Sequence, residues 1–97
     1  MLRYTVSMPP APAIGDLATR EINQTLDGTV SVRPFAPDTA SFTVDADKGT
    51  AIALFLTDID TSGNRSQPSA TLSFVATDTV PPPVPGGLGV TNVEQID

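Results

Sequence analysis

The residues best suited to chemistry are the acidic side chains of the stretch DIDTSG at positions 58–63. Side-chain oxygens alternate along it and a glycine follows, as in the first half of an EF-hand calcium loop. That loop ends on a glutamate that binds calcium through both of its oxygens, and here Ser69 stands at the corresponding position. Asp58 and Asp60 are therefore weak metal candidates, because turn formation explains the same residues better.

A looser calcium site that draws on Asp58, Asp60, Asp45 or Asp47 stays open as an alternative, although aspartates beside turns are usually solvated. Groups for nucleophilic or acid–base catalysis are scarce, since the chain has no histidine, no cysteine and only one lysine, Lys48, in a predicted turn. A carboxylate pair would need a cleft that a thin domain seldom offers. We expect a protein that is not an enzyme and that carries no metal or other cofactor.

Charge and hydropathy limit the partners. The formal net charge is −6, and the five basic residues form no cluster that could replace counterions on a phosphate backbone. The longest apolar run, residues 51–56, is too short to span a bilayer. Residues 1–8 alternate polar with apolar side chains and do not read as an export signal. We therefore expect neither a nucleic-acid nor a membrane partner, and no signal peptide in this chain.

Hydrophobic alternation indicates short strands that could position these side chains. Residues 2–8 are the clearest case, with every second side chain apolar: Leu2, Tyr4, Val6 and Met8. Residues 18–26 and 29–33 flank Asp27-Gly28, a pair that favours the type I′ turn of a hairpin. A helix over residues 15–24, capped by Asp16, remains an alternative to the first of these strands.

Three further strands are predicted toward the C-terminus. A proline-bearing connection at 33–39 leads to residues 40–44, whose Ala40, Phe42 and Val44 should point inward. Residues 50–59 are almost continuously apolar, which suggests a central strand that is buried on both faces. Residues 69–76 form the last strand, with one apolar face: Leu72, Phe74 and Ala76. Six short strands between turn signals predict an all-β sandwich or small barrel.

An ordered series of motifs resembles bacterial fibronectin type III domains over roughly half the chain. Gly49-Thr50 begins an alternating strand, DTSGNRSQPS follows at 60–69, and DTVPP follows at 78–82. The resemblance implies an immunoglobulin-like antiparallel β-sandwich. Residues 18–33 are similar to its C and C′ strands, 40–44 to E, 50–59 to F, 69–76 to G, and 2–8 to B. Met8 and Ile52 stand where the family often has a core tryptophan and a corner tyrosine.

By this resemblance the domain begins without a strand A, and the C-terminal tail resembles the missing strand. We divide the chain into a sandwich at 1–77 and a proline-rich arm at 78–97. The arm would act as a partner-binding segment, permuted or donated. Its prolines would set spacing or dock as polyproline II, and its apolar residues would pack into a sheet. The residues expected to act in this way are Pro82, Pro83, Pro85, Leu88, Val90, Val93 and Ile96.

The arm could pair with its own chain or with a neighbouring copy. Residues 77–87 span at most about 34 Å as polyproline II, whereas strand 50–59 implies a sandwich about 33 Å long. A return within one chain would be taut, so we expect exchange between chains and a homo-oligomer.

The hypotheses about function rest only on the predicted fold. The leading hypothesis is a virion structural protein of a tailed bacteriophage, a head decoration or tail accessory protein that binds capsid or tail proteins and starts at Met1. The alternative is a fibronectin type III module of a longer secreted glycan-active enzyme or adhesin, which would place it outside the cell. A small-ligand or calcium binder ranks third.

Overall fold

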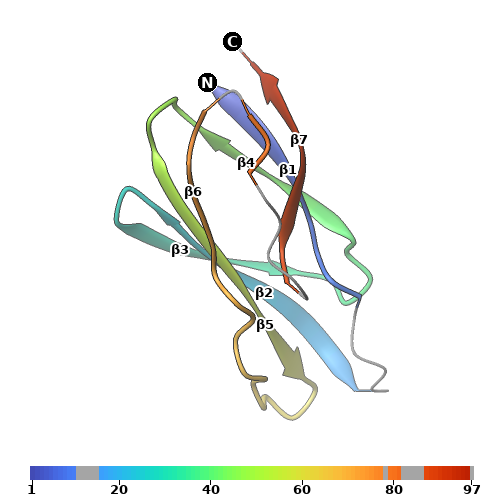
Figure 1. Cartoon of the computed structure of the whole chain (residues 1–97). Helices are drawn as coiled ribbons and strands as arrows, with labels where there is room; N and C mark the ends of the chain where they lie inside the picture. The colour runs from blue at the N-terminus through green and yellow to red at the C-terminus, as the bar shows by residue number, and fades with distance from the viewer. Residues whose placement is uncertain (11–15, 78, 82–86, 97) are drawn as a thin grey trace.

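The computed structural model describes residues 1–10, 16–77, 79–81 and 87–96, which form an all-β structure of two antiparallel sheets (Figure 1). The strands of these residues are, in order, β1 (Leu2–Ser7), β2 (Leu17–Leu26), β3 (Thr29–Phe35), β4 (Ser41–Ala46), β5 (Ala51–Asp60), β6 (Leu72–Val75) and β7 (Gly89–Gln95). The all-β prediction is confirmed, and residues 17–24 lie in a strand where a helix had been the alternative.

The first sheet has three strands in the order β4-β1-β7. β1 lies in the centre and pairs with β4 from Leu2↔Ala46 to Ser7↔Ser41. On its other side it pairs with β7, from Leu2↔Gln95 to Ser7↔Gly89, and the register shifts between Thr5 and Val6. This sheet therefore joins the two ends of the chain, and the N- and C-termini lie side by side in Figure 1.

The second sheet has four strands in the order β3-β2-β5-β6. A two-residue turn joins β2 to β3, and both of its residues have positive φ, 48° at Asp27 and 84° at Gly28, as the type I′ turn requires. The predicted hairpin is therefore confirmed. β2 also pairs with β5 along its length, and β5 pairs with the short strand β6.

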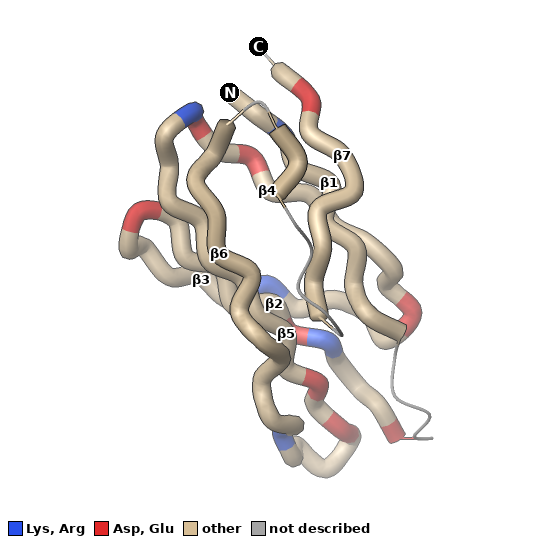
Figure 2. Tube along the Cα trace, viewed as in Figure 1, with Lys and Arg blue, Asp and Glu red and all other residues tan. Residues whose placement is uncertain are grey.

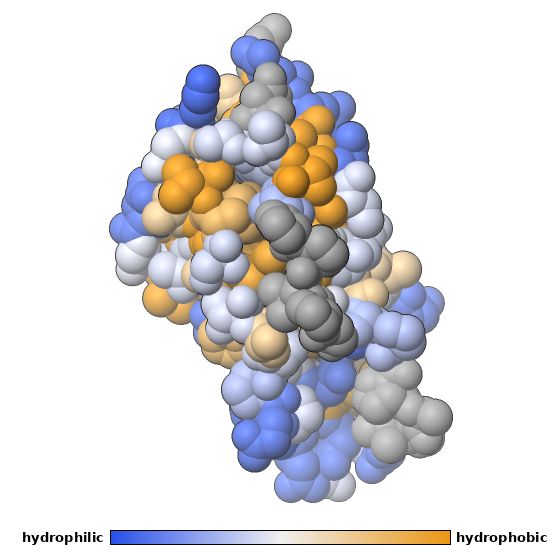
Figure 3. Space-filling view, viewed as in Figure 1, coloured by the Kyte–Doolittle hydropathy of each residue, from blue (hydrophilic) through white to orange (hydrophobic). Residues whose placement is uncertain are grey.

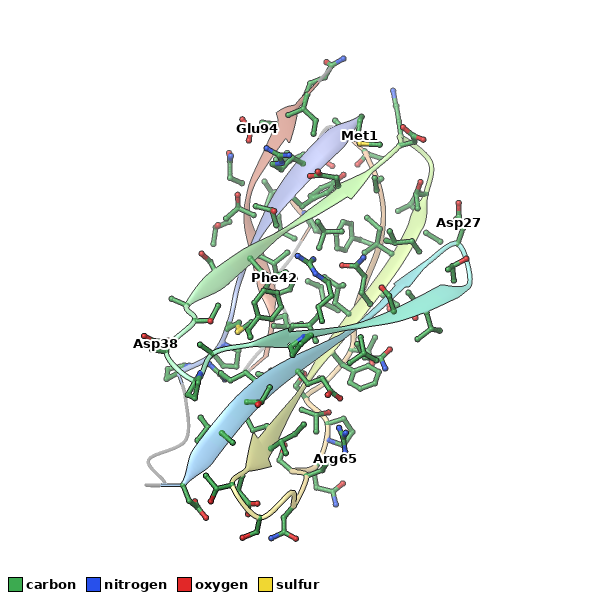
Figure 4. All side chains as sticks on the ribbon, turned by 180° about the vertical axis from the view of Figure 1, so that it is seen from behind. Met1, Asp27, Asp38, Phe42, Arg65 and Glu94 are labelled. Atoms are coloured by element: carbon green, nitrogen blue, oxygen red, sulfur yellow. The ribbon has the colours of Figure 1, made fainter. Side chains whose placement is uncertain are left out.

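A single apolar core lies between the sheets. β1, β4 and β5 contribute alternate side chains to it, which gives the burial pattern expected of half-buried strands, whereas β3 adds only the partly buried Phe35. The predicted inward residues of β1 are all buried, and Phe42 and Val44 are buried on β4. Figure 4 shows Phe42 between β4 and the strands of the second sheet. The core residues are Leu2, Tyr4, Val6, Met8, Ile22, Phe42, Val44, Ala46, Ile52, Leu54, Leu56, Leu72, Ala76, Leu88 and Val90.

Four details of the sequence-based strands are wrong. The last of these strands, predicted over residues 69–76, is the shorter strand β6 at Leu72–Val75. Ala40 is exposed, because β4 begins only at Ser41. The connection predicted from Arg33 is shorter, since β3 continues through Pro34 to Phe35. β5 lies in the interior of its sheet as predicted, but only one of its faces is buried, through Ile52, Leu54 and Leu56. Small or aromatic apolar residues on its other face produced the misleading run.

Candidate functional site

The described part of the C-terminal arm is a strand of the chain's own sandwich. Leu88 and Val90 are buried in the core, and Val93 packs against it while half-buried. Ile96 is also half-buried, and its backbone N–H donates to the carbonyl of Met1 at 2.9 Å. Pro82, Pro83 and Pro85 lie outside the described residues. The chain therefore reaches far enough for the arm to return to its own sheet, and exchange between chains stays a prediction.

Tyr4 ties the segment that follows β6 to the first sheet. Its ring is fully buried and packs edge-on against Phe74, with 5.0 Å between the ring centres. Its hydroxyl donates to the Thr77 carbonyl and accepts the Thr77 N–H at 2.8 Å. Sequence reasoning placed Tyr4 in the core but missed this role, because the two residues lie far apart in the chain.

Asp58, one of the two metal candidates, is held by a buried arginine. Arg20 is only 2% exposed, and its Nε lies 3.0 Å from Asp58 Oδ1. The guanidinium also donates to the Pro9 carbonyl at 2.8 Å, which ties the end of the first sheet's central strand to β2. Sequence reasoning missed this pair as well. The pairing satisfies a charge that would be costly to bury alone, so the Asp58 carboxylate acts as a structural group.

Asp60, the other candidate, organises the loop after β5. Its Oδ1 accepts the backbone N–H groups of Ser62 and Asn64, each at 2.9 Å, and its Oδ2 accepts the Asn64 side-chain amide at 3.1 Å. These bonds favour the charged carboxylate, and the bonds from Asn64 contribute most to lowering the pKa of Asp60. Gly63, with φ 85°, allows the tight turn that aims these donors at one side chain.

Charged residues lie in the turns and at the ends of the molecule, and others lie along the strands (Figure 2). Within the described residues, no three or more acidic, histidine or cysteine side chains gather where they could hold a metal ion. No helix of that part of the chain is long and apolar enough to cross a membrane. Arg3 and Asp45 form an exposed ion pair at 2.9 Å across β1 and β4, and this pair lowers the pKa of Asp45.

The outer face of the second sheet is where apolar side chains meet solvent. Register places small and apolar residues opposite one another on it, and Val30, Val32 and Val75 are 60%, 50% and 54% exposed. Figure 3 shows apolar atoms on the surface over β5 and β6 and beside β7. We define the uncharged face as these outward residues: Asn23, Thr25, Val30, Val32, Ala51, Ala53, Phe55, Ser73 and Val75.

A shallow groove of about 410 Å³ crosses the uncharged face beside the β2–β3 turn. The side chains on its floor are small, since Thr25, Ala53 and Ser73 stand opposite one another on neighbouring strands. Phe74 and Val75 of β6 also line it. Sequence reasoning missed this face, although the alternation of Val30 and Val32 on a predicted strand was a signal for it. The described residues that line the groove are uncharged, so it can accept apolar side chains.

Comparison with family models, with curated proteins and with solved structures gives no match for this chain.

Proposed function

We propose that the protein is a non-enzymatic structural protein that acts by binding other proteins. The setting we propose is the virion of a tailed bacteriophage, as a head decoration or tail accessory protein whose partners are its own copies and capsid or tail proteins. The virion setting is a fold-level analogy. The observation that carries the binding role is the uncharged face, which brings the exposed Val30, Val32 and Val75 to one side of the second sheet, because apolar side chains grouped at the surface commonly mark interaction sites.

The finer fold that we propose is fibronectin type III-like, with strand A placed at the C-terminus. If β7 is A, β1 is B and β4 is E, then the first sheet has the order E-B-A. With β2, β3, β5 and β6 as C, C′, F and G, the second sheet has the order C′-C-F-G. Both orders agree with the immunoglobulin-like arrangement. The bulge between β1 and β7 does not alter this assignment.

The charge pattern supports an interaction role over a catalytic one. The chain carries a net charge of −6, yet none of the outward residues that define the uncharged face is ionisable. The nearest outward carboxylate on β2, Glu21, is paired with Arg65 at 2.7 Å. A partner can therefore cover this face without burying an unpaired charge, which would be strongly unfavourable.

The test is whether the protein is a constituent of particles. Antibodies against the purified protein would be applied to gradient-purified virions of the phage that encodes it, with immunogold microscopy and quantitative mass spectrometry. We expect labelling at one part of the particle and a constant number of copies relative to the major capsid protein. A lysate protein that merely co-sediments would be lost after a high-salt wash and a second gradient.

Absence from washed particles would contradict the virion proposal. Detection of the sequence inside a longer secreted polypeptide would instead favour the module of a glycan-active enzyme or adhesin. The mass of the native polypeptide in infected cells, measured on immunoprecipitated material, separates these outcomes.

A further inference from the structure

Strand β3 is an open edge of the second sheet. Among the described strands it has one neighbour, β2, and it runs for seven residues, Thr29–Phe35. The turn fixes which of its backbone groups are free. In a two-residue hairpin the closing residues, here Leu26 and Thr29, form a hydrogen-bonded pair, and hydrogen-bonded pairs then alternate along the strands.

This alternation turns the backbone groups of every second residue away from β2. Val30, Val32 and Pro34 stand at the positions that are not bonded to β2, opposite Thr25, Asn23 and Glu21. Pro34 is consistent with this geometry, because proline has no N–H and fits an edge only where the nitrogen faces outward. The free edge therefore offers two donors, at Val30 and Val32, and three carbonyl acceptors, at Val30, Val32 and Pro34.

The other edges carry features that discourage pairing. On β4 the Thr43 carbonyl already accepts the Arg33 guanidinium at 2.8 Å, and Asp45 adds a charge. β6 has only four residues and is followed by Thr77, whose backbone is bound by Tyr4. β7 carries the exposed Glu94. Short strands, charges and covered ends are the usual protection of sheet edges, and β3 has only Pro34 near its end.

The one charged residue of β3 does not guard its edge. Arg33 points toward the core side, where it donates to Gln24 Oε1 at 3.0 Å and to the Thr43 carbonyl. Its guanidinium also lies 5.3 Å and 5.4 Å from the ring centres of Phe35 and Phe42. The side chains of β3 on the outer face of the sheet are thus Val30, Val32 and Pro34, and none of them is charged.

We propose that β3 pairs antiparallel with β3 of a second copy of this chain. Val30 of each copy lies opposite Val32 of the other, which uses both free donors and the carbonyls of Val30 and Val32 on each strand for four hydrogen bonds. A shift that places Val30 opposite Pro34 gives the same number of hydrogen bonds, because the Pro34 carbonyl then accepts in place of the Val30 carbonyl, but it leaves one valine pair in place of two. The dimer has one eight-stranded sheet, and the two uncharged faces become continuous.

A second copy suits this edge because of charge. Each copy carries −6, so two copies repel each other least where acidic residues are absent from the contact. The acids nearest to β3 in sequence, Asp27 and Asp38, lie in the loops before and after it, beyond both ends of the paired residues. Figure 4 shows both at the ends of β3. A two-fold axis relates two identical strands that pair antiparallel, so the same patch is used on both copies.

The contact is small, so we expect a weak dimer that forms at high local concentration. A contact made of four backbone hydrogen bonds and two valine pairs buries less surface than the roughly 1,000 Å² that a stable interface needs. This inference does not depend on the virion setting. It also differs from exchange of the C-terminal arm, which would use β7 and leave β3 free.

Sedimentation equilibrium of the full chain, from micromolar to millimolar concentration, tests the proposal with one variant and one matched control. Val32→Lys places a charge on the β3 edge, and Val75→Lys places it on β6 at a valine of similar exposure. We expect the native chain to form reversible dimers. The dissociation constant of the dimer should rise at least about 10-fold for Val32→Lys and change little for Val75→Lys. Far-UV circular dichroism checks that both variants fold.

Amide hydrogen exchange followed by NMR gives a readout that needs no variant. The amides of Val30 and Val32 should become protected as the native chain is concentrated, while those of Ser31 and Arg33, bonded to β2, should stay protected throughout. A monomer at every concentration overturns the proposal. So does a dimer that protects Val75 instead, or one that survives Val32→Lys unchanged and therefore forms through the arm or the face.

Discussion

The two sheets of this protein are assembled from the chain in different ways. The second sheet is built from two pairs of consecutive strands, β2–β3 and β5–β6, with β4 of the first sheet between them in the chain, and a two-residue hairpin joins β2 to β3. The first sheet takes β1 from the beginning of the chain, β4 from the middle and β7 from the end. Its strands are therefore brought together by contacts that are distant in sequence, and ordering the chain between them costs more entropy.

This difference teaches where the fold is most vulnerable. Among the described strands β7 has only one neighbour, β1, yet β7 and the residue before it deliver Val90 and Leu88 to the shared core. Losing it opens an edge of the first sheet and the core at once. The second sheet, in contrast, has its interior pair β2 and β5 aligned from Leu26↔Ile52 to Leu17↔Asp60.

The largest effect should follow removal of β7. A chain that ends at Pro85 loses the burial of Leu88 and Val90, and we expect a loss of more than about 4 kcal/mol in the free energy of unfolding, measured by urea titration. Adding a synthetic peptide of residues 87–97 should restore the native circular dichroism. A chain that ends at Gln95 is the control and should lose little. Native stability of the shorter chain would refute the dependence of the first sheet on β7.

The second sheet should be most sensitive at its buried ion pair. Asp58→Asn leaves the Arg20 guanidinium buried without a charged partner, and we expect about 3 kcal/mol of destabilisation in urea. Glu21→Gln is the matched control on the adjacent position of β2, because its partner Arg65 is exposed, and it should change stability by less than about 0.5 kcal/mol. Equal effects of the two substitutions would show that burial of Arg20 contributes nothing.

Breaking the link that Tyr4 makes between the two sheets should cost less stability than either of the changes above. Tyr4→Phe keeps the ring against Phe74 but removes the hydroxyl that binds the Thr77 backbone, and we expect a loss of about 1 to 2 kcal/mol. Tyr4→Leu removes the ring contact too and should cost more. Thermal unfolding followed by calorimetry compares them. If Tyr4→Phe is neutral, the hydroxyl is not what anchors this segment.

The smallest effect concerns the loop after β5 and depends on pH. Because hydrogen bonds lower the pKa of folded Asp60, its contribution to stability is complete above the pKa of the unfolded chain and is lost as pH falls through the folded pKa. Stability of the native chain should therefore drop below about pH 4. Asp60→Asn should flatten part of this drop, whereas Asp47→Asn at an exposed turn residue should not. Identical acid profiles for all three chains would contradict the role of Asp60.

Local signals in the sequence predicted most of the strands. Alternation alone identifies β1 and its buried face, and Asp27-Gly28 identifies the β2–β3 hairpin, because both depend on neighbours in the chain. The same reasoning overstated the burial of β5, since an apolar run does not tell whether a second layer covers it. It also ended β3 too early at Pro34, because a proline is acceptable on an edge and only the sheet order reveals the edge.

The candidate sites were less accessible to sequence reasoning. Asp58 and Asp60 were recognised as a pair with calcium-like spacing, but their partners decide what they do. Arg20 lies 38 positions from Asp58, so no local pattern connects them, whereas Asp60 binds the loop that directly follows it. The uncharged face likewise exists only once register sets Thr25, Ala53 and Ser73 side by side.

The sequence by itself determined the all-β class, the positions of its turns and the strand-like character of the tail, because these follow from side-chain alternation, glycine and proline. Tertiary structure decided that the tail completes the first sheet beside β1, that Tyr4 binds Thr77, and that β3 is left with an open edge. Those features depend on which distant strands become neighbours, and that choice is made by burying one shared core, a property of the whole chain.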